Sequence, residues 1–193
     1  MGRGFTIAAM EVAERMMADE YLAMDDERRG VQLIAGEVVV SEPLMSHQRV
    51  VGALYVALVM WVQAAGRRGE VVLPLDVKLD EDNVFAPDLL FYAPSNMPEN
   101  PGRRPYPMPD LAIEVRSPST WRYDLGIKKS KYEAAGLREL WLVDTESDTV
   151  VVFRRSASSA PIFDLALEPG RADTLTSPLL PGFELALGDV FAR

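Results

Sequence analysis

Two acidic residues stand in segments that otherwise have the pattern of buried strands. Asp88 lies in APDLLFYA, directly after a proline, and Glu114 lies in DLAIEVRSPST, near the end of an apolar run. A carboxylate in a buried strand is costly unless it is paired or coordinates a cation. Because a loop between the strands would make them neighbours, both carboxylates are expected to converge on one ion, for which Mg²⁺ or Mn²⁺ is suited. The alternative is that each carboxylate lies at a sheet edge or pairs with an arginine.

A lysine-rich segment, DLGIKKSKY, follows the second carboxylate. Asp124, Lys128 and Tyr132 are spaced four residues apart and therefore share one face of a helix. Lys128 is expected to lean toward the end of the strand that carries Glu114, where its ammonium would orient a water molecule or stabilise charge on a phosphate. An ordinary ion pair within the helix is the alternative.

Residue counts exclude several other chemistries. The chain has no cysteine, which excludes disulfides, thiol catalysis and thiolate metal sites. Its single histidine, His47, excludes a zinc site built from several imidazoles, and no G-x-S-x-G segment supplies a serine nucleophile. His47 is expected to be a polar side chain near a helix start rather than a general base.

Charge is distributed unevenly along the chain. With 20 basic and 29 acidic residues the net charge is −9, which argues against a protein that coats nucleic acid through bulk charge. From Arg103 to Lys131, however, seven basic and three acidic residues give a local net charge of +4. A basic strip beside two carboxylates suits a phosphodiester cleft, and a solvated helix face is the alternative. Neither a secretory signal nor a membrane-spanning apolar run is apparent, so a cytoplasmic protein is expected.

The elements that must position these residues predict an α+β fold, a mixed β-sheet flanked by helices, in one domain over residues 1–193. An amphipathic helix with an acidic face is expected at about 8–25. A second helix is expected from a cap at Ser46 to Gly66, and a third from Ser119 or Thr120 to a stop at Gly136. A proline-rich loop is expected at 93–109. The expected strands are 31–34, 37–40, 70–73, 75–79, 84–92, 110–116, 140–143 and 150–154, with further short strands from residue 162.

Five motifs, in a fixed order, resemble the Uma-type (DUF820-like) putative restriction endonuclease family. They are GE at 36–37, PD at 87–88, IEVRSPST at 113–120, the acid, lysine and tyrosine at 124, 128 and 132, and GLRELWLVD at 136–144. The similarity extends from about residue 31 to 191. That family is in turn similar to the PD-(D/E)XK nuclease superfamily, so the resemblance implies a restriction-endonuclease-like fold.

The resemblance also implies an activity: Mg²⁺- or Mn²⁺-dependent endonucleolytic hydrolysis of DNA phosphodiester bonds. Asp88 and Glu114 would be catalytic metal ligands, and Glu37 a further acidic ligand of the same site. Gln32 and Ala35 stand at positions where the family often has acidic residues.

The lysine is placed differently from the superfamily pattern. The superfamily has a lysine two residues after the second acid, and this chain has Arg116 there. The family draws its lysine from the following helix, which implies Lys128 as the catalytic lysine and Lys131 as the second candidate.

The sequence is compatible with more than one assembly state and more than one nucleic acid substrate. Nucleases of this type often form homodimers, and the acidic N-terminal helix and the apolar segment 140–143 are candidate interface segments. The competing interpretation is a nuclease fold without catalysis that serves binding or assembly. RNA or branched DNA is also open as a substrate.

Overall fold

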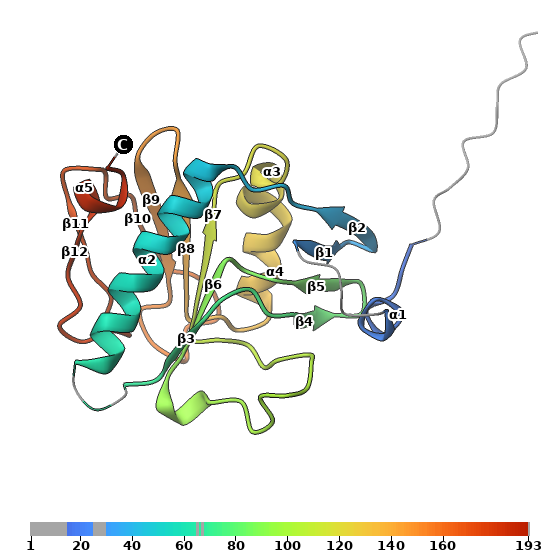
Figure 1. Ribbon diagram of the computed structural model, residues 1–193. Helices are drawn as coiled ribbons and strands as arrows, with labels where there is room; N and C mark the ends of the chain where they lie inside the picture. Colours follow the sequence, from blue (N-terminus) through green and yellow to red (C-terminus); the bar gives the residue numbers. More distant parts are fainter. Residues whose placement is uncertain (1–14, 25–29, 65, 67, 193) are drawn as a thin grey trace, which may run out of the picture.

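The computed structural model describes residues 15–24, 30–64, 66 and 68–192. Its main element is a six-stranded sheet (Figure 1). The strands, in sheet order, are β10 (Leu165–Leu167), β9 (Thr149–Arg154), β8 (Glu139–Asp144), β7 (Leu111–Val115), β6 (Leu89–Tyr92) and β3 (Glu70–Val72). β7 and β8 are parallel, whereas the other neighbours are antiparallel. The expected mixed sheet in an α+β fold is therefore confirmed.

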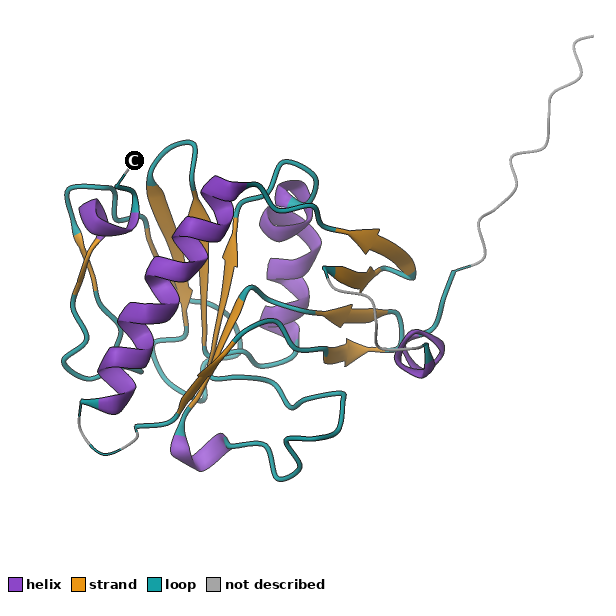
Figure 2. Cartoon of the chain, viewed as in Figure 1, coloured by secondary structure: helices purple, strands orange, loops and turns teal. Residues whose placement is uncertain are grey.

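A smaller antiparallel sheet of four strands stands beside the first (Figure 2). Its strands, in order, are β2 (Glu37–Val40), β1 (Val31–Ile34), β5 (Asn83–Phe85) and β4 (Val77–Asp80). β1 and β2 form the expected hairpin, with φ of 51° at Ala35 and 76° at Gly36. Helix α1 (Ala18–Ala23) packs Ala18 and Tyr21 against this sheet. The first part of the helix expected at about 8–25 lies outside the described residues, and residues 15–17 are not helical.

The prediction of a single strand over residues 84–92 is wrong. The segment breaks at residues 86–88, so β5 joins the small sheet and β6 the large one. Proline donates no hydrogen bond to a sheet ladder and restricts the residue before it, so Pro87 ends the pairing. In place of a ladder bond, the carboxylate of Asp88 accepts the backbone N–H of Val115 at 2.7 Å. The break thus places Asp88 where the two sheets meet.

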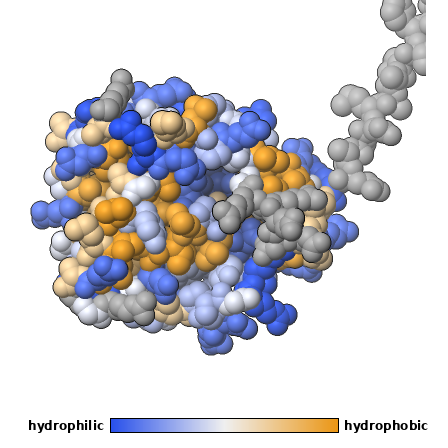
Figure 3. Space-filling model, in the orientation of Figure 1, coloured by the Kyte–Doolittle hydropathy of each residue, from blue (hydrophilic) through white to orange (hydrophobic). Residues whose placement is uncertain are grey.

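Helix α2 (Met45–Gln63) covers one face of the large sheet (Figure 1). The apolar side expected from its periodicity is the side that is buried, comprising Val50, Val51, Leu54, Leu58, Trp61 and Val62. Ser46 does not cap this helix, because the helix begins at Met45, two residues earlier than a cap at Ser46 requires, and its N-cap, Leu44, makes no side-chain hydrogen bond. The outer side of α2 keeps Val56 and Met60 exposed, and Figure 3 shows apolar surface gathered over this helix.

The opposite face of the large sheet is covered by one nearly continuous helix. It consists of α3 (Trp121–Tyr123), a π-helical turn η2 (Asp124–Lys128) and α4 (Lys129–Ala134). The helix expected between Thr120 and Gly136 is confirmed, with the π-helical turn as an addition.

Strand β7 alternates between these two layers. Its side chains at 111, 113 and 115 pack in the core beneath α2, whereas Ala112 packs on the side of α4. Glu114 therefore also faces α4.

The remaining elements are short, and those after residue 174 pack in the core beneath α2. They are a 3₁₀ turn η1 (Pro94–Asn96) in the proline-rich loop, β11 (Thr174–Leu175), β12 (Leu185–Ala186) and helix α5 (Leu187–Val190). Residues 140–143 of β8 are fully buried, so the expectation that they form a dimer interface is wrong. Within the part of the chain that the structure describes, every helix is too short or too polar to traverse a lipid bilayer.

Candidate active site

A groove of about 980 Å³ lies where the two sheets meet. Ala86 and Asp88 of the strand break line it together with Glu114 and Val115 at the end of β7. The rest of its lining comes from residues 30–32 at the start of β1, residues 41–51 around the start of α2, the loop segments 73–76 and 102–106, and Thr120. The two carboxylates selected from the sequence therefore open onto one groove.

Asp88 is held by hydrogen bonds to both carboxylate oxygens. Its Oδ2 accepts the N–H of Val115 at 2.7 Å, and its Oδ1 lies 3.1 Å from Nε2 of His47. The other ring nitrogen of His47, Nδ1, lies 3.3 Å from the carbonyl oxygen of Arg116. Burial alone would lower the pKa of His47, but the hydrogen bond to Asp88 and its charge outweigh burial and raise the pKa. The Asp88 side chain remains 22% exposed, so it is reachable from the groove.

Glu114 belongs to a buried cluster beneath the groove. Nζ of Lys128 lies 2.6 Å from Oε1 of Glu114 and 2.9 Å from Oδ1 of Asp124. The hydroxyl of Tyr132 donates to the same Oε1 at 2.8 Å. The Lys128 side chain is only 1% exposed and does not line the groove, so its ammonium reaches the groove only through Glu114.

The charges in this cluster do not balance. Burial raises the pKa of Glu114 to about 7, and the carboxylates of Asp124 and Asp88 add to this while Lys128 opposes it. Burial likewise raises the pKa of Asp124. For Lys128, burial alone would lower the pKa, but the two carboxylates outweigh it and raise the pKa above its ordinary value. Three carboxylates thus face one lysine and one histidine, and the excess of negative charge favours a further cation.

The donor set fits a divalent hard cation. Asp88 and Glu114 both line the groove, and the contacts of Glu114 with Lys128 and Tyr132 use one oxygen, Oε1. Among the described residues, no group of three or more His, Asp or Glu side chains is placed to hold a metal ion. Mg²⁺ is commonly bound by one or two carboxylates and retains water and phosphate ligands, so two carboxylates suffice as its protein ligands.

Two of the expected site residues lie apart from this cluster. Glu37 is exposed at the start of β2, beside the hairpin turn, and does not line the groove. Lys131 forms an ion pair with Asp80 of β4, with 2.7 Å between Nζ and Oδ2. The prediction that these two residues share the site with Asp88 therefore has no support from the contacts of the described residues.

Arg116, which stands at the superfamily lysine position, also points elsewhere. Its guanidinium pairs with Asp144 at 2.9 Å and with Glu146 at 2.7 Å, and it lies over the ring of Trp121. Lys128 is the lysine that contacts Glu114, as expected from the helix spacing.

Two polar residues of the groove, His47 and Gln32, were not predicted to belong to the site. His47 lies three, four and seven residues before the buried Val50, Val51 and Leu54, so helical periodicity indicates that it faces inward. Gln32 is buried in β1, lines the groove, and accepts the N–H of Ala86 at 3.2 Å through Oε1. Alternation along the hairpin does not single it out, because all four residues of β1 are buried.

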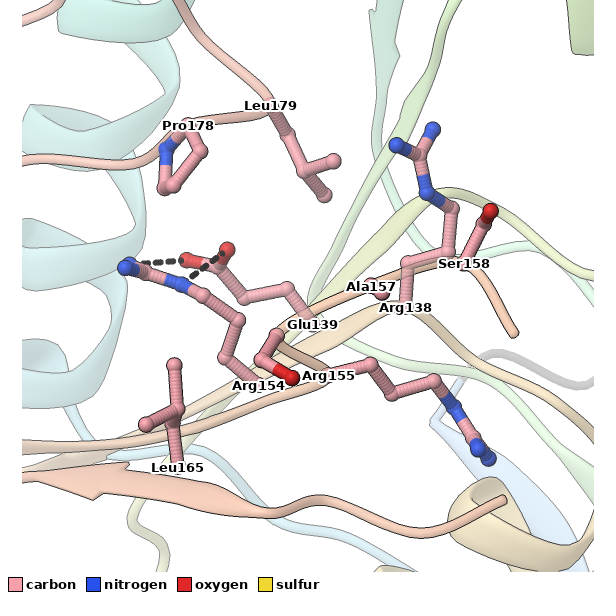
Figure 4. A pocket seen from close by; sticks show the side chains of 10 residues that line it. Arg138, Glu139, Arg154, Arg155, Ala157, Ser158, Leu165, Pro178 and Leu179 are labelled. Carbon is pink, nitrogen blue, oxygen red and sulfur yellow. Dashed lines mark hydrogen bonds and ion pairs between the residues drawn. The ribbon is translucent and has the colours of Figure 1, made fainter. Parts of the chain in front are cut away.

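A second cavity, of about 220 Å³, lies at the opposite end of β8 (Figure 4). Figure 4 shows the guanidinium of Arg154 against the carboxylate of Glu139. Nε and Nη2 of Arg154 donate to Oε2 and Oε1 of Glu139 at 2.8 and 3.1 Å. Glu139 is fully buried and also accepts from Trp141 Nε1 and Ser177 Oγ. These polar groups satisfy one another, so we interpret the cluster as structural.

Three comparisons place the chain among known proteins. Residues 18–188 match the family model Uma2, described as "Putative restriction endonuclease". A putative nuclease belonging to DUF820 from Anabaena variabilis superposes with a TM-score of 0.76 at 19% identity, over 92% of this chain and 98% of that one. This similarity confirms the expected restriction-endonuclease-like fold. The type IIG restriction endonuclease BpuSI matches with a TM-score of 0.41 at 15% identity, over 79% of this chain and 16% of that one. No curated protein matches the chain.

Proposed function

Because the chain belongs to the Uma2 family of putative restriction endonucleases, we propose that it is an endonuclease that hydrolyses DNA phosphodiester bonds with a divalent metal ion, Mg²⁺ or Mn²⁺. One observation carries the proposal. Asp88 and Glu114, 26 positions apart in the chain, open onto the same groove, and Lys128 contacts the second of them at 2.6 Å.

Asp88 and Glu114 are the residues that would hold the metal. A bound divalent cation neutralises charge on a phosphate and makes a water molecule more acidic. Neighbouring groups of the chain hold both carboxylates in position. The N–H of Val115 and the ring of His47 fix the Asp88 carboxylate, and Tyr132 and Lys128 fix that of Glu114.

Lys128 acts as a positioning residue in this proposal. Its ammonium is buried between Glu114 and Asp124, so it keeps Glu114 oriented toward the groove and opposes the rise in the pKa of Glu114 that burial causes. The hydrolysis itself is an attack of a water oxygen on the phosphorus, in line with the bond to the 3′ oxygen, which breaks. The water gives up a proton and the departing 3′ oxygen takes one, so the products are a 5′ phosphate and a 3′ hydroxyl.

Cleavage assays test the proposal. The purified protein is incubated with single-stranded DNA, duplex DNA, branched DNA and RNA, with Mg²⁺, with Mn²⁺ or with a chelator. We expect cleavage that needs the metal and that falls at least about a hundredfold in Asp88→Asn, Glu114→Gln and Lys128→Met, because each change removes part of the ligand set or its support. Lys131→Met and Glu37→Gln are matched controls and should retain cleavage.

Two results contradict the proposal. Undiminished cleavage by Asp88→Asn would show that the carboxylates are not the site. If the folded protein cleaves none of these substrates with either metal, it is a nuclease fold without catalysis that serves binding or assembly.

The proposal extends to assembly and location. We propose a cytoplasmic homodimer, in keeping with the absence of cysteine and the habit of such nucleases. Light scattering checks the assembly: a dimer has twice the 21.4 kDa mass of the chain, and a monomer mass at assay concentrations contradicts it.

A further inference from the structure

The groove that holds Asp88 and Glu114 has an unusual lining for a duplex-binding surface. Its basic side chains are Arg103, Arg104 and His47, among residues of the described chain. His47 is committed to Asp88, and Arg104 pairs with Asp76 at 3.1 Å. Arg103 is exposed and forms no ion pair within the described residues. A protein that follows a duplex neutralises several phosphates with lysine and arginine. Among the described residues of this lining, Arg103 is the arginine without an ion pair.

Apolar and aromatic side chains line the same groove. Leu73 is 53% exposed, Pro74 is exposed, and Leu75 and Tyr106 are half-buried, all four lining the groove. Flat or apolar surfaces beside a short run of positive charge are the features on which unpaired bases stack.

This wall is held together by the backbone and by one ion pair. The N–H of Tyr106 donates to the carbonyl oxygen of Asp76 at 2.8 Å, and Tyr106 bridges to Val77 at the start of β4. The Arg104–Asp76 ion pair joins the same two loop segments. The Tyr106 hydroxyl donates to Pro101 at 3.0 Å, so the ring is fixed in place by contacts at both of its ends.

We propose that the groove binds single-stranded DNA, with an unpaired base stacked on the wall formed by Leu73 and Tyr106 and a neighbouring phosphate on Arg103. The inference rests on the proposed function, because it names the form of DNA that reaches Asp88 and Glu114. The acidic body of the protein repels the closely spaced phosphates of a duplex, and a single strand presents fewer phosphates and exposes its bases to the wall.

Fluorescence anisotropy tests this proposal without catalysis. A labelled 12-nucleotide DNA strand and the duplex of the same sequence are titrated with the full chain in a chelator, so that no metal contributes. We expect the strand to bind at least about tenfold more tightly than the duplex. Tyr106→Ala and Leu73→Ser should each weaken binding of the strand by about tenfold, whereas Tyr106→Phe should retain it, because stacking needs the ring and not the hydroxyl.

The contribution of Arg103 is measured separately, through the salt dependence of binding. Arg103→Ala should lower the slope of log affinity against log salt by about 0.7, the value for one phosphate contact on a single strand. Tyr106→Ala should leave that slope unchanged. Arg171→Ala, an arginine paired with Asp148 and outside the groove lining, is the matched control and should change neither affinity nor slope.

Either of two results overturns the inference: a duplex bound as tightly as the strand, or strand binding that survives both Tyr106→Ala and Leu73→Ser. Leu73 is exposed, so its substitution keeps the test valid if Tyr106→Ala fails to fold. Failure of the inference is distinguishable from failure of the proposed function. If the protein cleaves duplex DNA with metal but does not prefer the single strand, the proposed function stands and the inference fails. If it binds the single strand selectively but cleaves nothing, the inference stands and the proposed function fails.

Discussion

At the scale of residues, the candidate site is defined by how each carboxylate is satisfied. Asp88 is partly exposed and bonded through both oxygens, whereas Glu114 is buried and bonded through one. The sequence indicates both because a carboxylate in an apolar strand is unusual, and it indicates Lys128 through helical spacing. It does not exclude Glu37 or Lys131, because short motifs record residue type and order but not the direction in which a side chain points.

Lys131 provides a prediction that separates a structural lysine from a functional one. Partial burial alone would raise the pKa of Asp80, but hydrogen bonds from Lys131 and Asn83 outweigh it and lower the pKa to about 2. A carboxyl with a lowered pKa stabilises the fold above its unfolded-state pKa, and this contribution is lost as the pH falls through the folded-state value.

Lys131→Met should therefore lower the free energy of unfolding at pH 7 by less than about 1 kcal/mol, as for other half-exposed ion pairs. The difference from the unchanged protein should shrink as the pH falls from 4 toward 2. Urea unfolding at several pH values measures this. If the difference in the free energy of unfolding instead grew on acidification, the ion pair with Asp80 would not be the source of the stabilisation by Lys131.

At the scale of elements, the site depends on two irregularities. The break at Pro87 transfers the chain from one sheet to the other and exposes Asp88. The π-helical turn lies between α3 and α4 and carries both Asp124 and Lys128. Regular elements were predictable from periodicity, as the hairpin of β1 and β2 and the buried side of α2 show. The irregularities do not follow from periodicity. Pro87 is a break signal within 84–92, but the apolar residues on both sides of it were interpreted as one strand. The helical pattern over 120–135 contains no signal that fixes where the hydrogen bonding shifts.

Deletion of Leu125, which is exposed, tests the π-helical turn. A π turn contains one residue more than an α-helical turn, so its removal should restore α-helical geometry and rotate one side of the helix relative to the other. We expect Lys128 to lose its contact with Glu114 or with Asp124. The far-UV circular dichroism should stay near that of the unchanged protein while cleavage is lost. Deletion of Ser158, an exposed loop residue, is the control, and equal activity in the two deletion proteins would contradict the role of the turn.

At the scale of the whole molecule, the groove exists because two sheets meet along one shared core. Ile34 and Phe85 of the small sheet pack with Ala112, Leu140 and Leu142 of the large one. The α+β class was predictable from the order of elements, but the division into two sheets was not, because it depends on long-range pairings such as Leu33 with Val84.

The shared core predicts that the chain unfolds as one domain. Tryptophan fluorescence and circular dichroism should report the same thermal midpoint, because Trp61 and Trp141 lie in the large-sheet core while circular dichroism reports both sheets. Two separate transitions would contradict the prediction of a single domain. A bound cation should raise the shared midpoint, since it binds only the folded state.

The most direct measurement is a calorimetric titration of the metal-free protein with Mn²⁺. We expect saturable binding that is lost in Asp88→Asn and in Glu114→Gln, and that persists in Glu37→Gln, whose side chain is exposed outside the groove. Binding of equal strength in Asp88→Asn, or no binding to the unchanged protein, would contradict the claim that these two carboxylates hold the catalytic ion.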